Sequence, residues 1–93
     1  MRAAAEDLRI TIHAHEEMVV EAIEYSELLE AIDSAHMLEA YPDHRRGPCC
    51  LLNGRTKRGR SLHIVCTMGD PALIIITIYV PESPKWVTPT QRS

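Results

Sequence analysis

The second half of the chain contains three short apolar runs that are separated by turns. These runs span residues 49–52, 62–68 and 73–80 and are rich in β-branched and other apolar residues. A polar segment with two glycines, residues 53–60, separates the first two runs, and Gly69-Asp70-Pro71 separates the last two. Such runs are typical of strands joined by tight connections. They predict an antiparallel meander, in which the last run, apolar on both faces, is the most central strand.

The first half of the chain predicts a short strand and two helices. Residues 8–12 alternate between apolar and polar side chains, as in a strand or an extended lead-in. From His13 the apolar residues follow helical spacing, with glutamates on the other faces and Thr11 as a candidate cap. Ser26 is a candidate cap for a second helix, which is expected to end near residues 33–36.

The order of these elements predicts an α+β fold. A further strand is expected at Met37–Tyr41, so a short N-terminal strand and two helices pack on a four-stranded antiparallel sheet. The chain is predicted to be a single domain over residues 1–93, with residues 1–7 and 87–93 as flexible tails. After Pro81 we expect an extended segment, with Trp86 docked on the core.

The composition favours a globular protein of the reducing cytoplasm. The longest apolar run, Ala72–Ile76, is too short to cross a bilayer, so no membrane span is expected. The N-terminus turns acidic at once and lacks the apolar region of a secretory signal. Three cysteines, two of them adjacent at Cys49 and Cys50, do not form a disulfide framework.

Charge is distributed unevenly along the chain. Residues 1–43 contain eleven acids and two arginines, whereas residues 44–60 contain six lysines and arginines and no acid. The basic block predicts a local anion-binding surface. Two alternatives remain open, namely a basic hairpin that neutralises the acidic helices of its own chain, or an acidic partner.

Several short motifs, in this order and spacing, carry a resemblance to a known family. They are Ile10-Thr11-Ile12-His13-Ala14, Glu17-Met18, Tyr41-Pro42-Asp43, Arg46-Gly47-Pro48, Gly54-Arg55-Thr56, Gly59-Arg60, Leu62-His63-Ile64-Val65-Cys66, and Ile76-Thr77-Ile78-Tyr79 with Pro81. Together they resemble the RelE/ParE-like toxin superfamily, and most of all a branch that is often encoded beside antitoxins with an MqsA-type zinc finger.

The resemblance implies a RelE-like fold and the toxin of a type II toxin–antitoxin system. Such a toxin is a metal-independent endoribonuclease that cleaves mRNA, often on the ribosome, and a tightly binding antitoxin silences it. Many members carry Arg where this chain has Glu17 and Glu21. The acidic helix therefore departs from the pattern of a helix that grips RNA, and the role of Glu17 stays open.

Cleavage of RNA without a metal needs a base, an acid and a cation that stabilises the charged phosphorane. His63 is expected on an open face of the sheet near Arg60, where it is a candidate acid or base. His13 opens the first predicted helix, where anions bind, and Tyr79 ends a strand where it can stack on a base or donate a proton. The alternatives are a half-buried structural His63, a capping His13 and a Tyr79 at the edge of the core.

The basic block supplies the candidate cations. Arg46 and Arg60 are expected to clamp phosphate through their guanidinium groups, with Arg45 beside the first. Lys57 and Arg58 at the hairpin tip are expected to steer the RNA backbone. The alternative for all five is a solvated basic face or ion pairs with the acidic helices.

No cofactor and no metal are expected. Cys49 and Cys50 are adjacent in a predicted strand and point to opposite faces, as do His63 and Cys66. Helical geometry separates His13 from His15 by about 200°. These placements do not suit a zinc site.

Two rival functions remain open beside the ribonuclease. One is a non-catalytic protein-binding module that keeps the fold, which the acidic helices and the sequence pI of about 5.9 favour. The other is a gyrase-directed toxin like some ParE relatives. An exposed edge strand offers a template for an antitoxin segment or for a homodimer.

Overall fold

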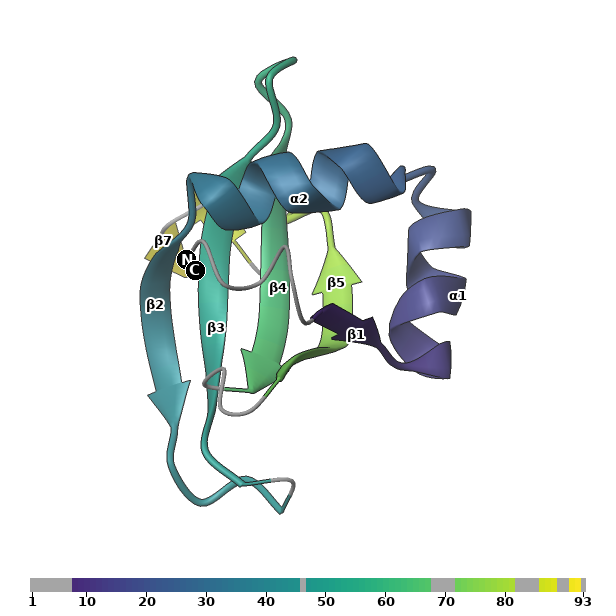
Figure 1. The fold of residues 1–93 in the computed structure, drawn as a ribbon. Helices are drawn as coiled ribbons and strands as arrows, with labels where there is room; N and C mark the ends of the chain where they lie inside the picture. Colours follow the sequence, from purple (N-terminus) through teal and green to yellow (C-terminus); the bar gives the residue numbers. More distant parts are fainter. Residues whose placement is uncertain (1–7, 46, 68–71, 82–85, 89–90, 93) are drawn as a thin grey trace.

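The computed structural model describes residues 8–45, 47–67, 72–81, 86–88 and 91–92 of the chain. Within them the protein is α+β, with two helices and a five-stranded mixed sheet (Figure 1). The elements are β1 (Leu8–Ile10), α1 (Ile12–Val20), α2 (Tyr25–Asp33), β2 (His36–Tyr41), β3 (Cys49–Arg55), β4 (Ser61–Thr67), β5 (Leu73–Tyr79), β6 (Trp86–Thr88) and β7 (Gln91–Arg92). Neither helix is long and apolar enough to cross a membrane.

The predicted antiparallel meander is present as β2, β3, β4 and β5, but the prediction of a four-stranded sheet is wrong in the number and order of the strands. The observed order is β1-β5-β4-β3-β2, and β1 joins as a fifth strand parallel to β5. Leu8 pairs with Leu73, and the Thr11 N–H donates to the Ile75 carbonyl oxygen at 3.1 Å. The short strand was visible in the sequence, but no local signal identifies a partner so far along the chain.

Strand β5 is also not the most central strand, as its apolar sequence had predicted. Strand β4 occupies the middle of the sheet, between β5 and β3. On β5, Leu73, Ile75 and Ile78 are buried, whereas Ile74 and Ile76 are only half-buried. The apolar run therefore has one core face and one partly covered face, and periodicity alone does not separate this case from a central strand.

Both helices begin at identifiable caps. Thr11 caps α1 as predicted, because its side-chain oxygen accepts the Ala14 N–H at 3.1 Å. The predicted cap Ser26 is wrong, since Glu24 is the N-cap of α2 and forms a capping box with Glu27. Glu27 Oε1 accepts the Glu24 N–H at 3.1 Å. Two glutamates three residues apart are a sequence signal for this capping box, but Glu is a less usual N-cap residue than Ser.

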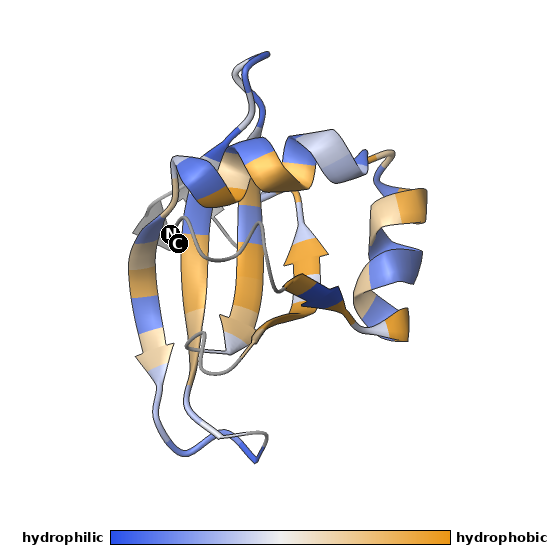
Figure 2. Ribbon diagram, in the orientation of Figure 1, coloured by the Kyte–Doolittle hydropathy of each residue, from blue (hydrophilic) through white to orange (hydrophobic). Residues whose placement is uncertain are grey.

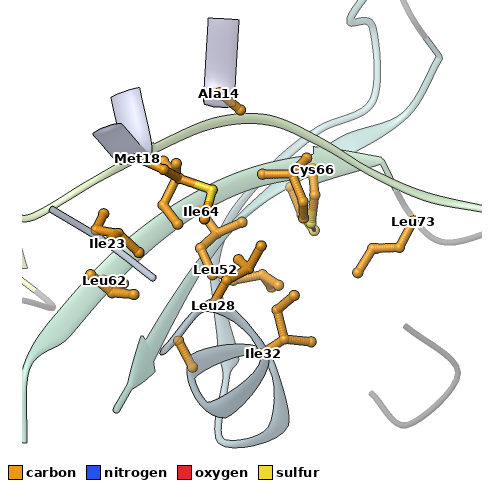
Figure 3. Packing of buried hydrophobic residues seen from close by; sticks show 14 residues of the cluster. Ala14, Met18, Ile23, Leu28, Ile32, Leu52, Leu62, Ile64, Cys66 and Leu73 are labelled. Carbon is orange, nitrogen blue, oxygen red and sulfur yellow. Dashed lines mark hydrogen bonds between the residues drawn. The ribbon is translucent and has the colours of Figure 1, made fainter. Parts of the chain in front are cut away.

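The main core lies between the helices and one face of the sheet. Leu28 and Ile32 of α2 pack over Leu52 and Ile64, and Met18 of α1 closes the same cluster (Figure 3). The side of α2 that faces the sheet is apolar and its outer side is polar (Figure 2). This burial stabilises the fold by about 25 cal/mol per Å² of apolar surface removed from water.

The opposite face of the sheet is buried as well. Alternation along β3 directs Cys50 and Leu52 to the helices and Cys49 and Leu51 to the other side, and all four are buried. Beyond the sheet, β6 and β7 form a small antiparallel ribbon where an extended tail was predicted. The predicted tail at residues 1–7 lies outside the described part of the chain.

Candidate functional site at the end of strand β5

The outer edge of β5 is closed by helix α1 rather than by a full-length strand. Strand β1 pairs only with Leu73–Ile75, and α1 runs beside the rest of the edge (Figure 1). Thr11 Oγ1 donates to the Ile76 carbonyl oxygen at 3.1 Å. Glu17 Oε1 accepts the Ile78 N–H at 3.0 Å and the hydroxyl of Thr77. The carboxylate therefore takes the place of a neighbouring strand's carbonyl.

Glu21 repeats this arrangement one helical turn later. Its Oε1 accepts the Val80 N–H at 3.3 Å. Side chains four residues apart lie on the same face of a helix, so both carboxylates reach the same strand edge. The role of Glu17, which the sequence left open, is thus to pair the exposed backbone of β5. The sequence signal for this role is the pair of glutamates four residues apart in the helix that follows the first predicted strand.

His13 lies in front of the Glu17 carboxylate. Its Nε2 is 3.4 Å from Glu17 Oε1 and 3.5 Å from Thr77 Oγ1, and 66% of its side chain is exposed. The imidazole is therefore available to solvent and oriented by a carboxylate, which is the arrangement of an acid or base held by a second group. Helix α1 begins one residue earlier, so the sequence had placed His13 correctly at the helix start.

A hollow of about 280 Å³ lies between α1 and the end of β5. Its lining includes His13, Glu16, Glu17, Val20, Glu21, Ile78 and Tyr79. Three carboxylates therefore line this hollow, and no lysine or arginine is among these lining residues. The field inside it attracts cations and opposes a phosphate.

His63 is buried in the sheet and contacts Tyr79 at the end of β5. Its Nδ1 is 3.3 Å from the Tyr79 hydroxyl, and the two rings meet edge to face with centroids 5.3 Å apart. The expectation of an open sheet face at His63 is wrong, because its side chain is 0% exposed. Alternation correctly separated it from Leu62 and Ile64, but nothing local indicated that the second face is covered. Its cross-strand neighbour Asn53 is also buried, and Asn53 Oδ1 has no hydrogen-bond partner.

Arg60 is engaged with the turn between the helices. Its guanidinium donates to the carbonyl oxygens of Ala22, at 3.0 Å, and Glu21, at 2.5 Å. Nη1 is 3.6 Å from Glu27 Oε1, within the capping box of α2. Ala22 has a positive φ of 54°, so Arg60 stabilises a tight turn and places its charge at the C-terminus of α1.

The remaining predicted cations are spread over the surface. Lys57 and Arg58 are exposed at the β3–β4 tip, and the Lys57 N–H donates to Glu30 Oε1 at 3.0 Å. Arg45 is exposed before β3, while Arg46 lies outside the described residues. The ion pair of Arg60 with Glu27 favours the alternative in which the basic hairpin neutralises the acidic helices, whereas the contact of the tip with Glu30 is made by the Lys57 backbone.

The three cysteines are buried and form no disulfide. The sulfurs of Cys50 and Cys66 lie 4.0 Å apart across β3 and β4, and burial raises the pKa of both thiols. A thiol in this state is a poor nucleophile. Within the described ranges, no group of three His, Cys, Asp or Glu side chains is placed to hold a metal ion.

Two of the five predicted catalytic residues therefore line one hollow, and a third contacts one of them. His13 and Tyr79 line the hollow at the end of β5 and His63 contacts Tyr79, whereas Arg60 is bound to the helix turn. In comparisons with known proteins, a family model described as "Domain of unknown function (DUF4258)" matches residues 10–80, from the end of β1 to just past β5. No curated protein and no solved structure matches the chain.

Proposed function

From the premise that this chain belongs to the DUF4258 family, we propose that it is a non-catalytic, RelE-like module that binds another protein. The observation that carries the proposal is the engagement of Arg60. Its guanidinium is held by the carbonyl oxygens of Glu21 and Ala22 and by the Glu27 carboxylate. A phosphate would have to displace all three, and the α1–α2 turn would lose its cation.

Two further features support a binding role. His63, the second predicted catalytic group, is buried and has no exposed surface with which to touch a substrate. The hollow at the end of β5 carries three carboxylates, which oppose the approach of RNA. The element order of a strand, two helices and a meander supports the RelE-like comparison. That comparison implies an antitoxin, such as an MqsA-type zinc-finger protein, as the partner, in the cytoplasm.

Induced expression in a bacterial host tests this proposal. We expect no loss of mRNA with the wild-type chain, and no cleavage of RNA by the purified protein, with or without ribosomes. Folding of the purified protein is checked by circular dichroism. Cleavage of RNA by the wild type that is lost in His13→Ala would overturn the proposal.

The shared hollow of His13 and Tyr79, with His63 in contact with Tyr79, favours an endoribonuclease as a second candidate function. In this reaction His13 Nε2 removes the proton of a 2′-hydroxyl, and the 2′-oxygen then attacks the phosphorus. The Tyr79 hydroxyl, in contact with His63, donates a proton to the leaving 5′-oxygen. Glu17 orients His13 from 3.4 Å.

This second candidate predicts its own pattern of variants. RNA cleavage falls sharply in His13→Ala and in Tyr79→Phe, because each change removes one proton-transfer group. His36→Ala, at an exposed histidine of β2 away from the hollow, is the matched control and leaves cleavage within a few-fold of the wild type. Equal activity in all three variants contradicts the site.

A further inference from the structure

Strand β2 is the outermost strand on one side of the five-stranded sheet (Figure 1). Its inner side pairs with β3, and no strand of the described residues pairs with its outer side. Toward the other side of the sheet, by contrast, the edge of β5 is bonded by β1 and by the carboxylates of Glu17 and Glu21. An unpaired edge presents backbone N–H and C=O groups that another strand can bond.

The hydrogen bonds of β3 show which backbone groups of β2 face this outer edge. The Arg55 N–H donates at 2.9 Å to the hydroxyl of Ser34, just before β2, and that hydroxyl donates to the Arg55 carbonyl oxygen at 3.0 Å. Bonding direction alternates along an antiparallel strand, so odd-numbered residues of β3 bond β2 and even-numbered residues bond β4. Met37 and Ala40 are the residues of β2 that pair with even-numbered residues of β3. Their N–H and C=O groups therefore point away from β3, to the outer edge.

Met37 and Ala40 are also exposed to solvent. Met37 is 48% exposed, and Ala40 is exposed as well. Among the described residues, no hydrogen bond to the outward N–H or C=O groups of either residue is formed. Strand β2 carries neither lysine nor proline, which commonly block an edge of this kind. The two residues therefore offer their apolar side chains and their backbone groups to a neighbouring strand.

We propose that the occupant of this edge is the β2 strand of a second copy of the chain, antiparallel and related by a two-fold axis. In this pairing Met37 bonds the partner's Ala40 and Ala40 bonds the partner's Met37, so the outward backbone groups of both copies are all bonded. Both residues lie on the helix side of the sheet, because they pair with residues of β3 that belong to the core under the helices. The long side chain of Met37 then covers the small side chain of the partner's Ala40.

The irregular shape of β2 favours a second copy over an unrelated strand. Leu38 forms a β-bulge, because its neighbours Met37 and Glu39 pair with consecutive residues of β3. A bulge bends a strand and increases its twist. A two-fold axis between Leu38 and Glu39 places the two bulges opposite each other. The two edges then share the same bend, and each has two residues between its bonded pairs.

A flexible segment of another protein fits this edge less well. Two bonded pairs give about four backbone hydrogen bonds, and a flexible segment would lose its conformational freedom to form them. In a second copy, β2 is already an ordered strand. Like charge opposes the dimer, since each copy carries a net charge of −3 and Glu39 lies beside the two-fold axis. Association should therefore strengthen as salt rises.

Sedimentation equilibrium of the full chain, at concentrations from about 1 to 500 μM, tests the dimer, and we expect a dimer at the upper end of this range. Ala40→Pro removes an outward N–H and places the proline ring at the edge, but it breaks no hydrogen bond to β3. The chain should therefore stay folded, checked by circular dichroism, while its dimer dissociation constant rises at least about tenfold. Ala40→Ser keeps the N–H and is the matched control, with a dissociation constant within about twofold of the wild type.

Cross-linking tests the register without a proline. A mixture of the Met37→Cys and Ala40→Cys variants, treated with a mild oxidant, should form disulfide-linked dimers. Neither variant alone should do so, because the two-fold axis places each of these residues opposite the other one. The three native cysteines are buried, so they do not take part in this reaction.

The inference goes beyond the proposed binding function and does not depend on it. A wild-type chain that stays monomeric over the whole concentration range would overturn the dimer, whether or not the chain binds another protein. A dimer that survives unchanged in folded Ala40→Pro would show that the contact lies elsewhere and would also overturn the proposal. Cross-linking of Met37→Cys alone or of Ala40→Cys alone would overturn the two-fold register.

Discussion

The Glu17 carboxylate accepts the backbone N–H of Ile78 at 3.0 Å, and so a helix side chain closes the edge of a strand. The same oxygen accepts the hydroxyl of Thr77 and lies 3.4 Å from His13 Nε2. Glu17 therefore both pairs the backbone of β5 and contacts His13 of the candidate site. The acidic character of α1, which departs from the RNA-gripping pattern, has a structural cause in this contact.

We expect Glu17→Ala to destabilise the protein by about 2 kcal/mol, because hydrogen bonds to a charged group are worth about 1.5–3 kcal/mol each and partial exposure weakens them. Glu17→Gln keeps one acceptor oxygen and should cost about half as much. Urea unfolding of the three proteins measures the difference. An unchanged midpoint in Glu17→Ala would show that water replaces the carboxylate at the β5 edge.

Arg60→Lys should destabilise the chain by about 1–3 kcal/mol, despite keeping the charge. A lysine ammonium does not reproduce the planar fork that reaches the carbonyl oxygens of both Glu21 and Ala22. Arg58→Ala, at an exposed position of the same hairpin, is the control and should change stability by less than about 0.5 kcal/mol. Denaturant unfolding measures the free energy of unfolding of both variants, and an equal loss in the two would contradict this role of Arg60.

Gly54→Ala should prevent stable folding or cost several kcal/mol, on the order of 3 or more. A Cβ at Gly54 would lie 2.0 Å from the Ala31 carbonyl oxygen, so α2 would have to move off β3. Gly59→Ala meets no atom within 4 Å but has a φ of +85°, and it should cost only about 1 kcal/mol. Thermal denaturation compares them, and a mild effect at Gly54 would mean that α2 is not held closely on the sheet.

The thiols of Cys50 and Cys66 should react slowly with a thiol reagent at mildly alkaline pH. Burial raises the pKa of both, so the thiolate that reacts is scarce in the native state. The raised pKa values also make the free energy of unfolding depend on pH. Below the unfolded-state pKa of about 8.5 the two thiols do not reduce this free energy, and it falls as pH rises above that value, because the unfolded chain loses these protons first. Absorbance assays in native buffer and in concentrated guanidinium chloride measure the contrast, and rapid native reaction would contradict it.

The sequence predicts the positions of the candidate site residues along the chain, but not which of them are exposed. The end of β5 could be placed from its apolar run, and His13 from the start of α1. The separation of His63 from Leu62 followed from strand alternation. The exposure of His63 does not follow from strand alternation, because it depends on what covers the second face of the sheet. A buried His63 has the same local sequence as an exposed one.

The sequence by itself determined the order of the elements, the Thr11 cap, the alternating faces of the strands and the acidic character of α1. These properties depend on residues a few positions apart, which interact in any compact state. Only the tertiary structure decided that β1 pairs in parallel with β5, that Glu17 closes the edge of β5 and that Arg60 binds the α1–α2 turn. Each of these contacts joins residues far apart in the chain, and its partner is selected by which backbone groups the finished sheet leaves unpaired.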